Sequence, residues 1–521
     1  MDLRLAMPAT RAPCDIASRV PKSSRTRQKT SLPYARVALG LALTAAIALR
    51  LWLAGHNGGL TMDSPLYVRM AEALGRGVPL AGPAHHGYPA LVALAGVAVP
   101  GREWPGRVVS LVAGVALVAL TYGLARRRLA PAWSAAAAWL VALHPIAAVY
   151  SGAIMTEATL LALLYTAVLL ANHERPLAAG GLFGMAWLVR PEALVVAPAA
   201  ALLSRPGGRG GLWMAVGLAA FMVPYAGYLR WERGEWMFTP KTVLVRPLVA
   251  DRREAEWRLG DSVAVADSVS LAERTRRAAP SIARSYLPRL ARHVGVLLES
   301  WSWPLLLLGA IGAWAAWGAL FAPLVLIAGL PLLAVPFDAR FALLPLPALA
   351  VFAAAGAAWL TERIPSRRAA IAGAVAALAL GVGLIWGGPA GIQALAFDDG
   401  PMPQLREAGE WLRAQGRGDL RVMDRKAYVP FFAAAEHIQF PNDDYDTVLD
   451  FARRERVDYI VFEEYLISVL RPQFLPLVQD REFRLRERRV RQAFVTGRVP
   501  MTGVAIFEVV RDSSGPGAKR R

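Results

Sequence analysis

The chain has 521 residues, with 58 Lys and Arg against 39 Asp and Glu, so its formal net charge is +19. Charged residues make up only 19% of the sequence, whereas soluble domains usually have roughly 25%. The deficit is concentrated in nearly uncharged runs such as 37–54, 108–125 and 369–386, which are long enough to cross a bilayer. This composition excludes a soluble enzyme, and the single cysteine, Cys14, excludes a disulfide scaffold. Because loop charges on two sides of a membrane are summed, the basic excess does not indicate a nucleic-acid partner.

Residues 1–34 are polar and basic, contain four prolines and have no apolar run. They are predicted to form a disordered cytoplasmic arm. The apolar segment that follows, 35–54, exceeds the roughly 7 to 15 residues of a signal-peptide core. It is therefore predicted to be a retained first transmembrane helix.

Further apolar segments follow in chain order, and each satisfies the hydropathy criterion for a membrane span. They lie near 107–125, 131–149, 152–171, 177–189, 191–203, 212–230, 302–320, 322–336, 341–361 and 369–387. Together with the first span they predict a polytopic α-helical membrane protein with about eleven transmembrane helices, whose membrane module covers residues 35–388.

The segment 177–203 is predicted to be a hairpin of two short helices. Arg190-Pro191 interrupts it, and proline removes a backbone donor and disfavours helix at the residue before it. A hairpin also places the main basic clusters on the side of the basic N-terminus, as the positive-inside rule requires. These clusters are Arg126 to Arg128, Arg175, Arg205, Arg209, Arg363, Arg367 and Arg368. The N-terminus is therefore predicted to be cytoplasmic and the C-terminus external.

Three hydrophilic segments are then external. Two are loops, at 55–106 and 231–301, and the third is a C-terminal domain at 389–515 with a tail at 516–521. In the C-terminal segment, predicted helices at about 405–412 and 447–456 alternate with predicted strands at 420–423, 457–462 and 503–510. Alternation at this spacing is typical of a small α/β domain.

Asp63 is the first candidate functional residue, because ionisable groups near a membrane are costly and are usually functional. It precedes Ser64 and Pro65, a pattern that is also typical of a helix N-cap. The two interpretations are compatible, since a capping aspartate at a loop–helix junction can also face a cleft.

The other candidates each have a structural alternative. Glu157 could interact with a helix dipole in a first turn, and Arg190 could form an internal pair with Glu157 or Glu192. Arg340 could extend its side chain to the membrane interface. The predicted topology nevertheless places all of these groups on the external face, together with His144. Such a cluster suits an anionic lipid head group.

The order of these motifs resembles the GT-C integral-membrane glycosyltransferases, in particular the relatives of protein O-mannosyltransferases, lipid A aminoarabinose transferase and rhizobial lipopolysaccharide core transferases. The resemblance spans residues 35 to about 361. Its motifs are Asp63 followed by Tyr67 and Ala71, Tyr88-Pro89, His144-Pro145, Met155-Thr156-Glu157, Leu188-Val189-Arg190-Pro191-Glu192 and Arg340-Phe341 with Pro345.

The resemblance implies transfer of one sugar from a polyprenyl-phosphate donor to an acceptor hydroxyl at the outer face, with inversion at the anomeric carbon. Asp63 would be the general base, and Arg340 would bind the donor phosphate, with Lys241 and Arg246 as further candidates for that role. The cleft would be shaped by Tyr67, His85, His86, His144, Glu157 and Arg190. The acceptor, whether glycan, lipid or protein, is not specified by the sequence.

No metal is required by this chemistry, because a lipid phosphate monoester needs less neutralisation than a pyrophosphate, and the first loop has no Asp-x-Asp motif. His85-His86 could bind a divalent cation, but adjacent loop histidines are more often solvated. The sequence departs from the family where Ser64 follows Asp63 in place of a second acid, where Tyr88 replaces a proline, and where Phe341 replaces a tyrosine.

Two other classes of protein remain open. A transporter or flippase of lipid-linked sugars would have inverted repeats and broken helices near the bilayer midplane. A polysaccharide polymerase or ligase would use one large arginine-rich external loop, and the segment 231–301 contains Arg252, Arg253, Arg274, Arg276 and Arg277.

Overall fold

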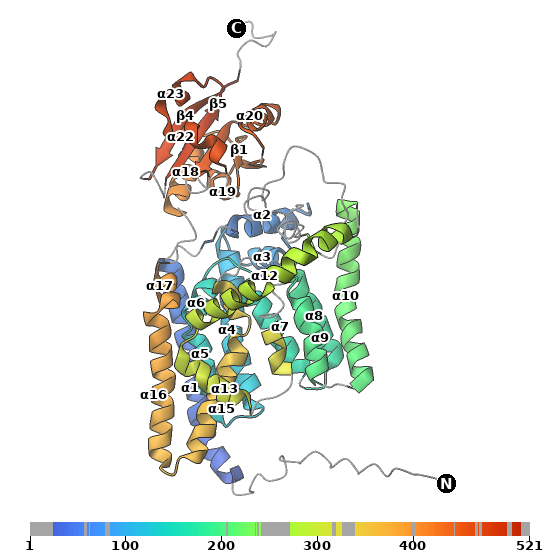
Figure 1. The fold of residues 1–521 in the computed structure, drawn as a ribbon, viewed down its shortest axis with the longest axis vertical. Coiled ribbons are helices and arrows are strands. Elements are labelled where there is room, and N and C mark those ends of the chain that lie inside the picture. The colour runs from blue at the N-terminus through green and yellow to red at the C-terminus, as the bar shows by residue number, and fades with distance from the viewer. Residues whose placement is uncertain are drawn as a thin grey trace, which may run out of the picture.

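A computed structural model describes residues 24–56, 60–61, 63–78, 84–171, 173–204, 207–234, 236, 239–240, 271–314, 319–325, 339–396, 402–441, 443–463, 467, 471–497 and 503–511. A helical bundle forms the larger part, and a small α/β domain lies at one end of it (Figure 1). The start of α1 and the turn between α15 and α16 lie at the opposite end. The structure thus has two parts, a helical bundle and an α/β domain.

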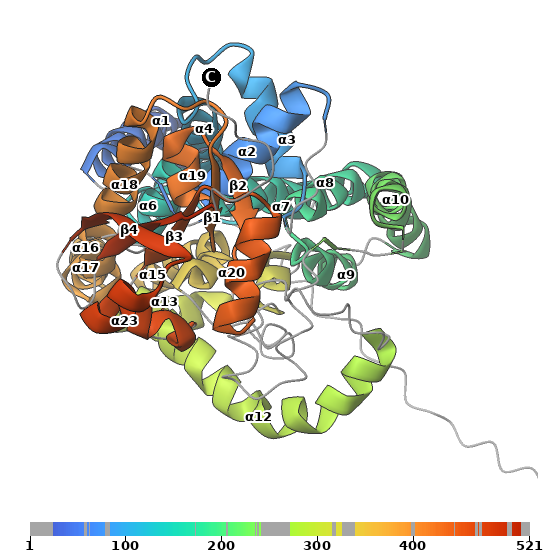
Figure 2. The same ribbon diagram turned by 90° about the horizontal axis from the view of Figure 1, so that it is seen from above.

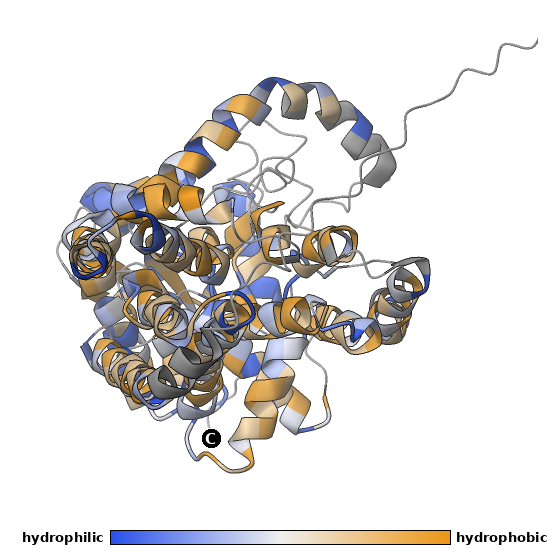
Figure 3. Cartoon of the chain, turned by 90° about the horizontal axis from the view of Figure 1, so that it is seen from below, coloured by the Kyte–Doolittle hydropathy of each residue, from blue (hydrophilic) through white to orange (hydrophobic). Residues whose placement is uncertain are grey.

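The bundle is that of a multi-pass membrane protein. Among the described residues, four helices are long and apolar enough to cross a membrane, or six if each of two bent pairs forms one span. The four helices are α1 (Ser24–His56), α4 (Trp104–Arg126), α10 (Gly207–Arg233) and α16 (Arg367–Gly387). Hydrophobic residues predominate along the bundle helices when the molecule is seen from the end opposite the α/β domain (Figure 3).

The remaining apolar helices are shorter than the predicted spans. The predicted span 131–149 is two helices, α5 (Pro131–Ala142) and α6 (Pro145–Gly152), bent by 61° because His144-Pro145 interrupts the backbone ladder. In the segment 302–320, α13 (Trp303–Ala313) ends early, and η4 (Ala319–Leu324) is a 3₁₀ turn. Most of the predicted span 322–336 lies outside the described residues. The helix count of about eleven is not confirmed.

The predicted hairpin is confirmed. Helix α8 (Pro176–Val189) ends before Arg190, and α9 (Ala193–Ser204) starts after Glu192. Helix α7 (Glu157–Ala171) packs beside α8, and α8 packs closely on α10. A Cβ atom at Gly180 would overlap the Met214 carbonyl, so glycine permits this close approach.

Helix α1 starts at Ser24, inside the segment predicted to be a disordered arm, so that prediction is wrong for residues 24–34. The cause is local: between Ser24 and Pro33 the sequence contains neither glycine nor another proline, and helix runs through this stretch into the apolar span.

Three helices cover the end of the bundle that faces the α/β domain (Figures 1 and 2). They are α2 (Ser64–Gly75), α3 (Gly87–Gly96) and α12 (Leu271–Ser300), which is amphipathic. The segment 231–301, predicted as a loop, therefore contains a long helix. Helix α12 packs against η6 (Ala339–Leu343), which precedes α15 (Leu346–Arg363).

The α/β domain contains a five-stranded sheet of order β2-β1-β3-β5-β4. Strand β1 (Arg421–Asp424) pairs in parallel with β2 (Glu436–Gln439) and β3 (Tyr459–Glu463). Strand β5 (Val504–Val509) pairs antiparallel with β3 and with β4 (Val490–Thr496). The predicted strands correspond to β1, β3 and β5, whereas the sequence analysis missed β2 and β4.

The predicted helices of this domain are α18 (Met402–Ala414) and α20 (Tyr445–Arg454), and both are confirmed. The domain also contains α19 (Tyr428–Ala433), η7 (Pro472–Phe474), α22 (Leu475–Gln479) and α23 (Arg481–Arg486). Its predicted start at residue 389 is wrong, because α17 (Pro389–Leu395) packs on α6 and α16 through Ala394 and Trp386.

Candidate active site

The loop before α2 is fixed to the segment between α6 and α7. Ser64 Oγ accepts a hydrogen bond from the Thr61 amide at 2.8 Å and donates one to the Ile154 carbonyl at 3.0 Å. Asp63 occupies the N-cap position of α2, but its carboxylate makes no capping hydrogen bond there. The interpretation of Asp63 as a side-chain cap is therefore wrong, and its carboxylate points to other groups.

Two cations from distant parts of the chain contact this carboxylate. Lys426 Nζ lies 2.9 Å from Oδ1 of Asp63, and Arg340 Nη1 lies 3.5 Å from Oδ2. The three side chains are each about one-third exposed, at 33%, 32% and 28% for Asp63, Lys426 and Arg340. An ion pair that water can reach is exchangeable, because each partner can be solvated or can take another ligand.

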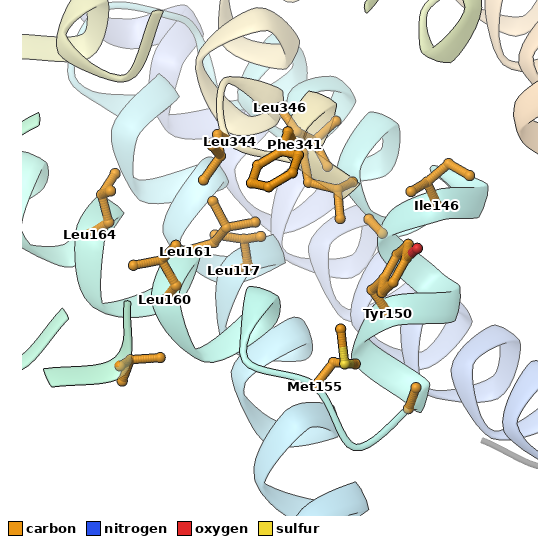
Figure 4. Close-up of a cluster of buried hydrophobic side chains, with 14 of the residues drawn as sticks. Leu117, Ile146, Tyr150, Met155, Leu160, Leu161, Leu164, Phe341, Leu344 and Leu346 are labelled. Atoms are coloured by element: carbon orange, nitrogen blue, oxygen red, sulfur yellow. The ribbon is translucent and has the colours of Figure 1, made fainter. Parts of the chain in front are cut away.

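The position of Arg340 follows from its neighbour Phe341, which is buried. Phe341 packs into a cluster of apolar side chains from several bundle helices (Figure 4). This cluster includes Leu117 of α4, Ile146 and Tyr150 of α6, Leu160, Leu161 and Leu164 of α7, and Leu344 and Leu346. Tyr165 also donates a 2.8 Å hydrogen bond to the Leu344 carbonyl. The turn that carries Arg340 is thus anchored on the bundle core.

Glu157 and Arg190 form a second ionic group beside the first. Arg190 Nη1 lies 2.5 Å from Glu157 Oε1, and its Nη2 lies 2.7 Å from Glu192 Oε1. All three residues are buried. Both predicted pairings of Arg190 are therefore present, and they tie the α8–α9 hairpin to the first turn of α7. Arg340 Nη1 approaches the same Glu157 oxygen at 4.0 Å, which connects the two groups.

Tyr67 lies in α2 beside these charges and is buried. Its ring packs edge-to-face on Tyr88, at 5.3 Å between centroids, and Tyr88 in turn contacts Ser110 at 2.8 Å. Burial, followed by the negative charges of Asp63 and Glu157, raises the pKa of Tyr67 above its ordinary value, so the phenol remains neutral. Tyr67 is therefore a buried, neutral aromatic neighbour of the two ionic groups.

The two loop histidines lie in a different environment from the one expected. His85 and His86 are buried rather than solvated. His86 Nδ1 lies 2.8 Å from the Tyr225 hydroxyl, and His85 Nε2 lies 2.9 Å from Thr239 Oγ1. The His85 ring packs on Trp187 of α8 and Tyr225 of α10, and the His86 ring packs on Tyr225 and Tyr228 of α10. The contacts described for the two histidines are thus with aromatic side chains and with Thr239.

His144 is also buried and has a local structural role. It is the N-cap of α6, where its Nδ1 accepts from the Ala147 amide, and its Nε2 lies 3.1 Å from the Ser300 carbonyl. It therefore joins the break in the α5–α6 pair to the end of α12. No contact described for His144 reaches the Asp63 cluster.

Lys241 and Arg246 lie outside the described residues, so their proposed role stays a prediction. Lys426 was missed by the sequence analysis because a charged pair, Arg425-Lys426, in a hydrophilic domain resembles an ordinary solvated surface. A signal was present, since the pair directly follows a predicted strand and ligands gather at the carboxyl ends of parallel strands. Within the part of the chain that the structure describes, no three His, Cys, Asp or Glu residues lie close enough to hold a metal ion.

At this site the Asp63 carboxylate can accept a proton, and the two neighbouring cations can bind an anion. The chain matches the model of the dolichyl-phosphate-mannose-protein mannosyltransferase family over residues 89–233. Comparison of the sequence with curated proteins gives no match.

Two kinds of solved structure share the fold at low sequence identity. ArnT from Cupriavidus metallidurans bound to undecaprenyl phosphate is 12% identical, with a TM-score of 0.53 over 93% of this chain and 99% of that chain. The oligosaccharyltransferase of Archaeoglobus fulgidus tethered to an acceptor peptide is 14% identical, with a TM-score of 0.56 over 86% of this chain and 72% of that chain. The predicted resemblance to the GT-C membrane glycosyltransferases is thereby confirmed.

Proposed function

We propose that this protein transfers a single sugar from a polyprenyl-phosphate donor to an acceptor hydroxyl at the outer face of the bacterial cytoplasmic membrane. One observation carries the proposal. The Asp63 carboxylate and the Arg340 guanidinium lie 3.5 Å apart although 277 residues separate them in the chain. The two residues proposed as the base and the phosphate-binding cation are thus adjacent, at the end of the bundle that α2, α3 and α12 cover.

In the proposed reaction, the acceptor oxygen attacks the anomeric carbon while Asp63 takes the hydroxyl proton. The bond between the anomeric carbon and the phosphate oxygen breaks, and the polyprenyl phosphate leaves with the bonding electron pair. Arg340 stabilises the charge that develops on that phosphate, because a guanidinium binds phosphate oxygens through charge-assisted hydrogen bonds. Attack from the face opposite the leaving group inverts the anomeric centre.

Two neighbours of known structure support the donor class. ArnT was crystallised with undecaprenyl phosphate, and the archaeal oligosaccharyltransferase was studied with a dolichol phosphate and an inhibitory peptide. No metal is included in the proposed mechanism, because Arg340 supplies a positive charge at the leaving group.

Mass spectrometry of cell-envelope glycans and of polyprenyl-phosphate sugars tests this function. Cells that lack the gene should lose one sugar from a glycan, lipid or protein and accumulate the lipid-linked donor. Cells expressing the Asp63→Asn variant at the parental level should show the same pattern. Identical glycan and donor profiles in all three strains would rule out the proposed transfer.

The proposed orientation has its own test. The positive-inside distribution of arginines favours an orientation with the α/β domain outside the cytoplasmic membrane. A phosphatase reporter, which is active only outside the cytoplasm, should therefore be active when fused after Arg521. Activity of a cytoplasmic reporter at the same position would show that the α/β domain and the candidate site lie on the cytoplasmic side.

A further inference from the structure

The α/β domain contributes a charged side chain to the site of the membrane module. Lys426 lies in the turn between β1 and α19, and its ammonium group is 2.9 Å from the carboxylate of Asp63, 363 residues earlier in the chain. The membrane module thus supplies the carboxylate and Arg340, and the external domain supplies the second cation.

The turn that carries Lys426 is held by hydrogen bonds within the α/β domain. The Val429 amide donates to the Asp424 carboxyl at 3.3 Å, and the Tyr428 amide donates to the Lys426 carbonyl at 2.7 Å. The Gln439 side chain donates to the Arg425 carbonyl at 3.0 Å. Lys426 is therefore presented from a fixed backbone rather than from a long free loop.

Other contacts dock the domain without the help of Lys426. The Tyr428 hydroxyl donates to the Thr61 carbonyl at 2.6 Å. Arg102 donates to the Phe431 carbonyl at 2.8 Å and lies over the Phe431 ring at 4.2 Å. Arg406 also pairs with Glu103 at 3.5 Å. The Lys426–Asp63 pair is thus additional to an interface that already has both polar and aromatic contacts.

The arrangement at Asp63 is poorly suited to a base. Two cations beside a carboxylate stabilise its charged form and oppose proton uptake. The donor phosphate, which is esterified to both the sugar and the polyprenol, carries one negative charge and two free oxygens, so it can take the same charge-assisted contacts as the carboxylate. It gains a second negative charge when the sugar leaves, and the two cations can then stabilise that charge. If the donor phosphate binds them, the carboxylate loses its counter-ions and becomes a better proton acceptor.

We propose that Lys426 is a donor-binding residue, and that the donor phosphate and the Asp63 carboxylate compete for Lys426 and Arg340. This inference rests on the proposed function. Asp63 is neutralised by the two cations in the donor-free enzyme, and donor binding releases it. The external domain therefore couples donor binding to the availability of the base.

Undecaprenyl phosphate is the lipid that leaves in the proposed reaction, and it has the same phosphate and chain as a donor without its sugar. Its binding to the full-length protein in lipid nanodiscs, followed by native mass spectrometry, tests this proposal. Undecaprenol, which has the same chain and no phosphate, is the control ligand. Lys426→Met should weaken binding of undecaprenyl phosphate by about tenfold or more, the loss expected for a charge-assisted contact, and leave undecaprenol binding unchanged. Lys426→Arg should restore most of the affinity.

The competition gives a second and opposite expectation. Asp63→Asn should bind undecaprenyl phosphate more tightly than the parent, by roughly two- to fivefold, the range for losing one partly exposed ion pair. In the double variant with Lys426→Met this gain should shrink, because one of the contested cations is gone. Equal affinity of Lys426→Met and the parent would overturn the role of Lys426, and an Asp63→Asn variant that binds no tighter would overturn the competition.

Two controls separate this role from docking and from the proposed function. Arg102→Met removes a docking contact and should leave the affinity for undecaprenyl phosphate near the parental value. If it reproduced the loss seen with Lys426→Met, the effect would be structural and the proposal would fail. If the parent itself bound undecaprenyl phosphate no better than undecaprenol, the proposed donor class would fail instead.

Discussion

Asp63 and Glu157 are carboxylates that share Arg340 as a neighbour, yet they lie in opposite environments. Glu157 is 5% exposed and lies 2.5 Å from Arg190, which is itself buried between two glutamates. Asp63 is 33% exposed and contacts Lys426 and Arg340 from two other segments. The difference indicates that the buried group fixes helices in place, whereas the accessible group is free to exchange partners. A base that takes a proton from a bound acceptor must be within reach of that acceptor, which the exposure of Asp63 permits.

The largest expected effect comes from Asp63→Asn. Asparagine has nearly the same size but accepts no proton, so sugar transfer should fall by roughly 10² to 10⁴, the usual contribution of a general base. Expression should remain near normal, because the side chain makes no capping hydrogen bond that the amide would lose. Transfer rates of purified parent and variant in liposomes check this. A variant that transfers at the parental rate would remove Asp63 from the mechanism.

Glu157→Gln should act on stability more than on chemistry. It leaves Arg190 buried with one carboxylate in place of two, and breaking a buried ion pair typically costs about 3 to 5 kcal/mol. We expect a large drop in the thermal unfolding midpoint in detergent. Glu72→Gln is a suitable control, since its ion pair with Arg102 is partly exposed. Similar midpoints for the two variants would contradict the assignment of Glu157 as a structural group.

Arg340→Ala should have an intermediate effect, which is weaker binding of the donor. Removing a guanidinium that binds phosphate should cost about 1.5 to 3 kcal/mol of donor binding, because the contact is charge-assisted. The fold should tolerate the change, since the neighbouring Phe341 provides the buried anchor. The donor concentration at half-maximal transfer measures the effect. If that concentration were unchanged at normal protein levels, Arg340 would only extend to the membrane interface.

The sequence predicted much of this site because its residues carry short-range signals. Asp63, Glu157, Arg190 and Arg340 are charges next to apolar spans, and the topology placed them on one face. Two results needed three-dimensional information. The burial of His85 and His86 depends on aromatic side chains of α8 and α10. These partners are distant in the sequence, so no local pattern around the two histidines indicates them. Lys426 contacts Asp63 only because the α/β domain docks on α2. No periodic pattern in the sequence indicates how two domains dock, so this contact could not be predicted.

The smallest expected effect concerns two acidic groups behind the Lys426 turn. Asp424 and Glu463 end the parallel strands β1 and β3, and both are buried. Burial raises the pKa of Asp424 well above its ordinary value, and the charge of Glu463 raises it further. Burial also raises the pKa of Glu463, although the positive charges of Arg425 and Lys426 oppose that rise. The native state thus retains protons that the unfolded chain loses.

The contribution of these two groups to stability should therefore be largest in acid, and it should fall as the pH rises from about 4, where they ionise in the unfolded chain, through their raised native pKa values. Glutamine at position 463 is neutral at every pH, so Glu463→Gln should flatten this dependence. At pH 8 it should raise the free energy of unfolding by on the order of 1 kcal/mol, and with it the unfolding midpoint. Thermal unfolding of the full-length protein between pH 5 and 8 checks the sign. The contrary result would be a parental midpoint that rises over this range and that Glu463→Gln does not change. It would show that Asp424 and Glu463 are ionised in the folded domain, so that the groups beside the Lys426 turn are charged rather than neutral.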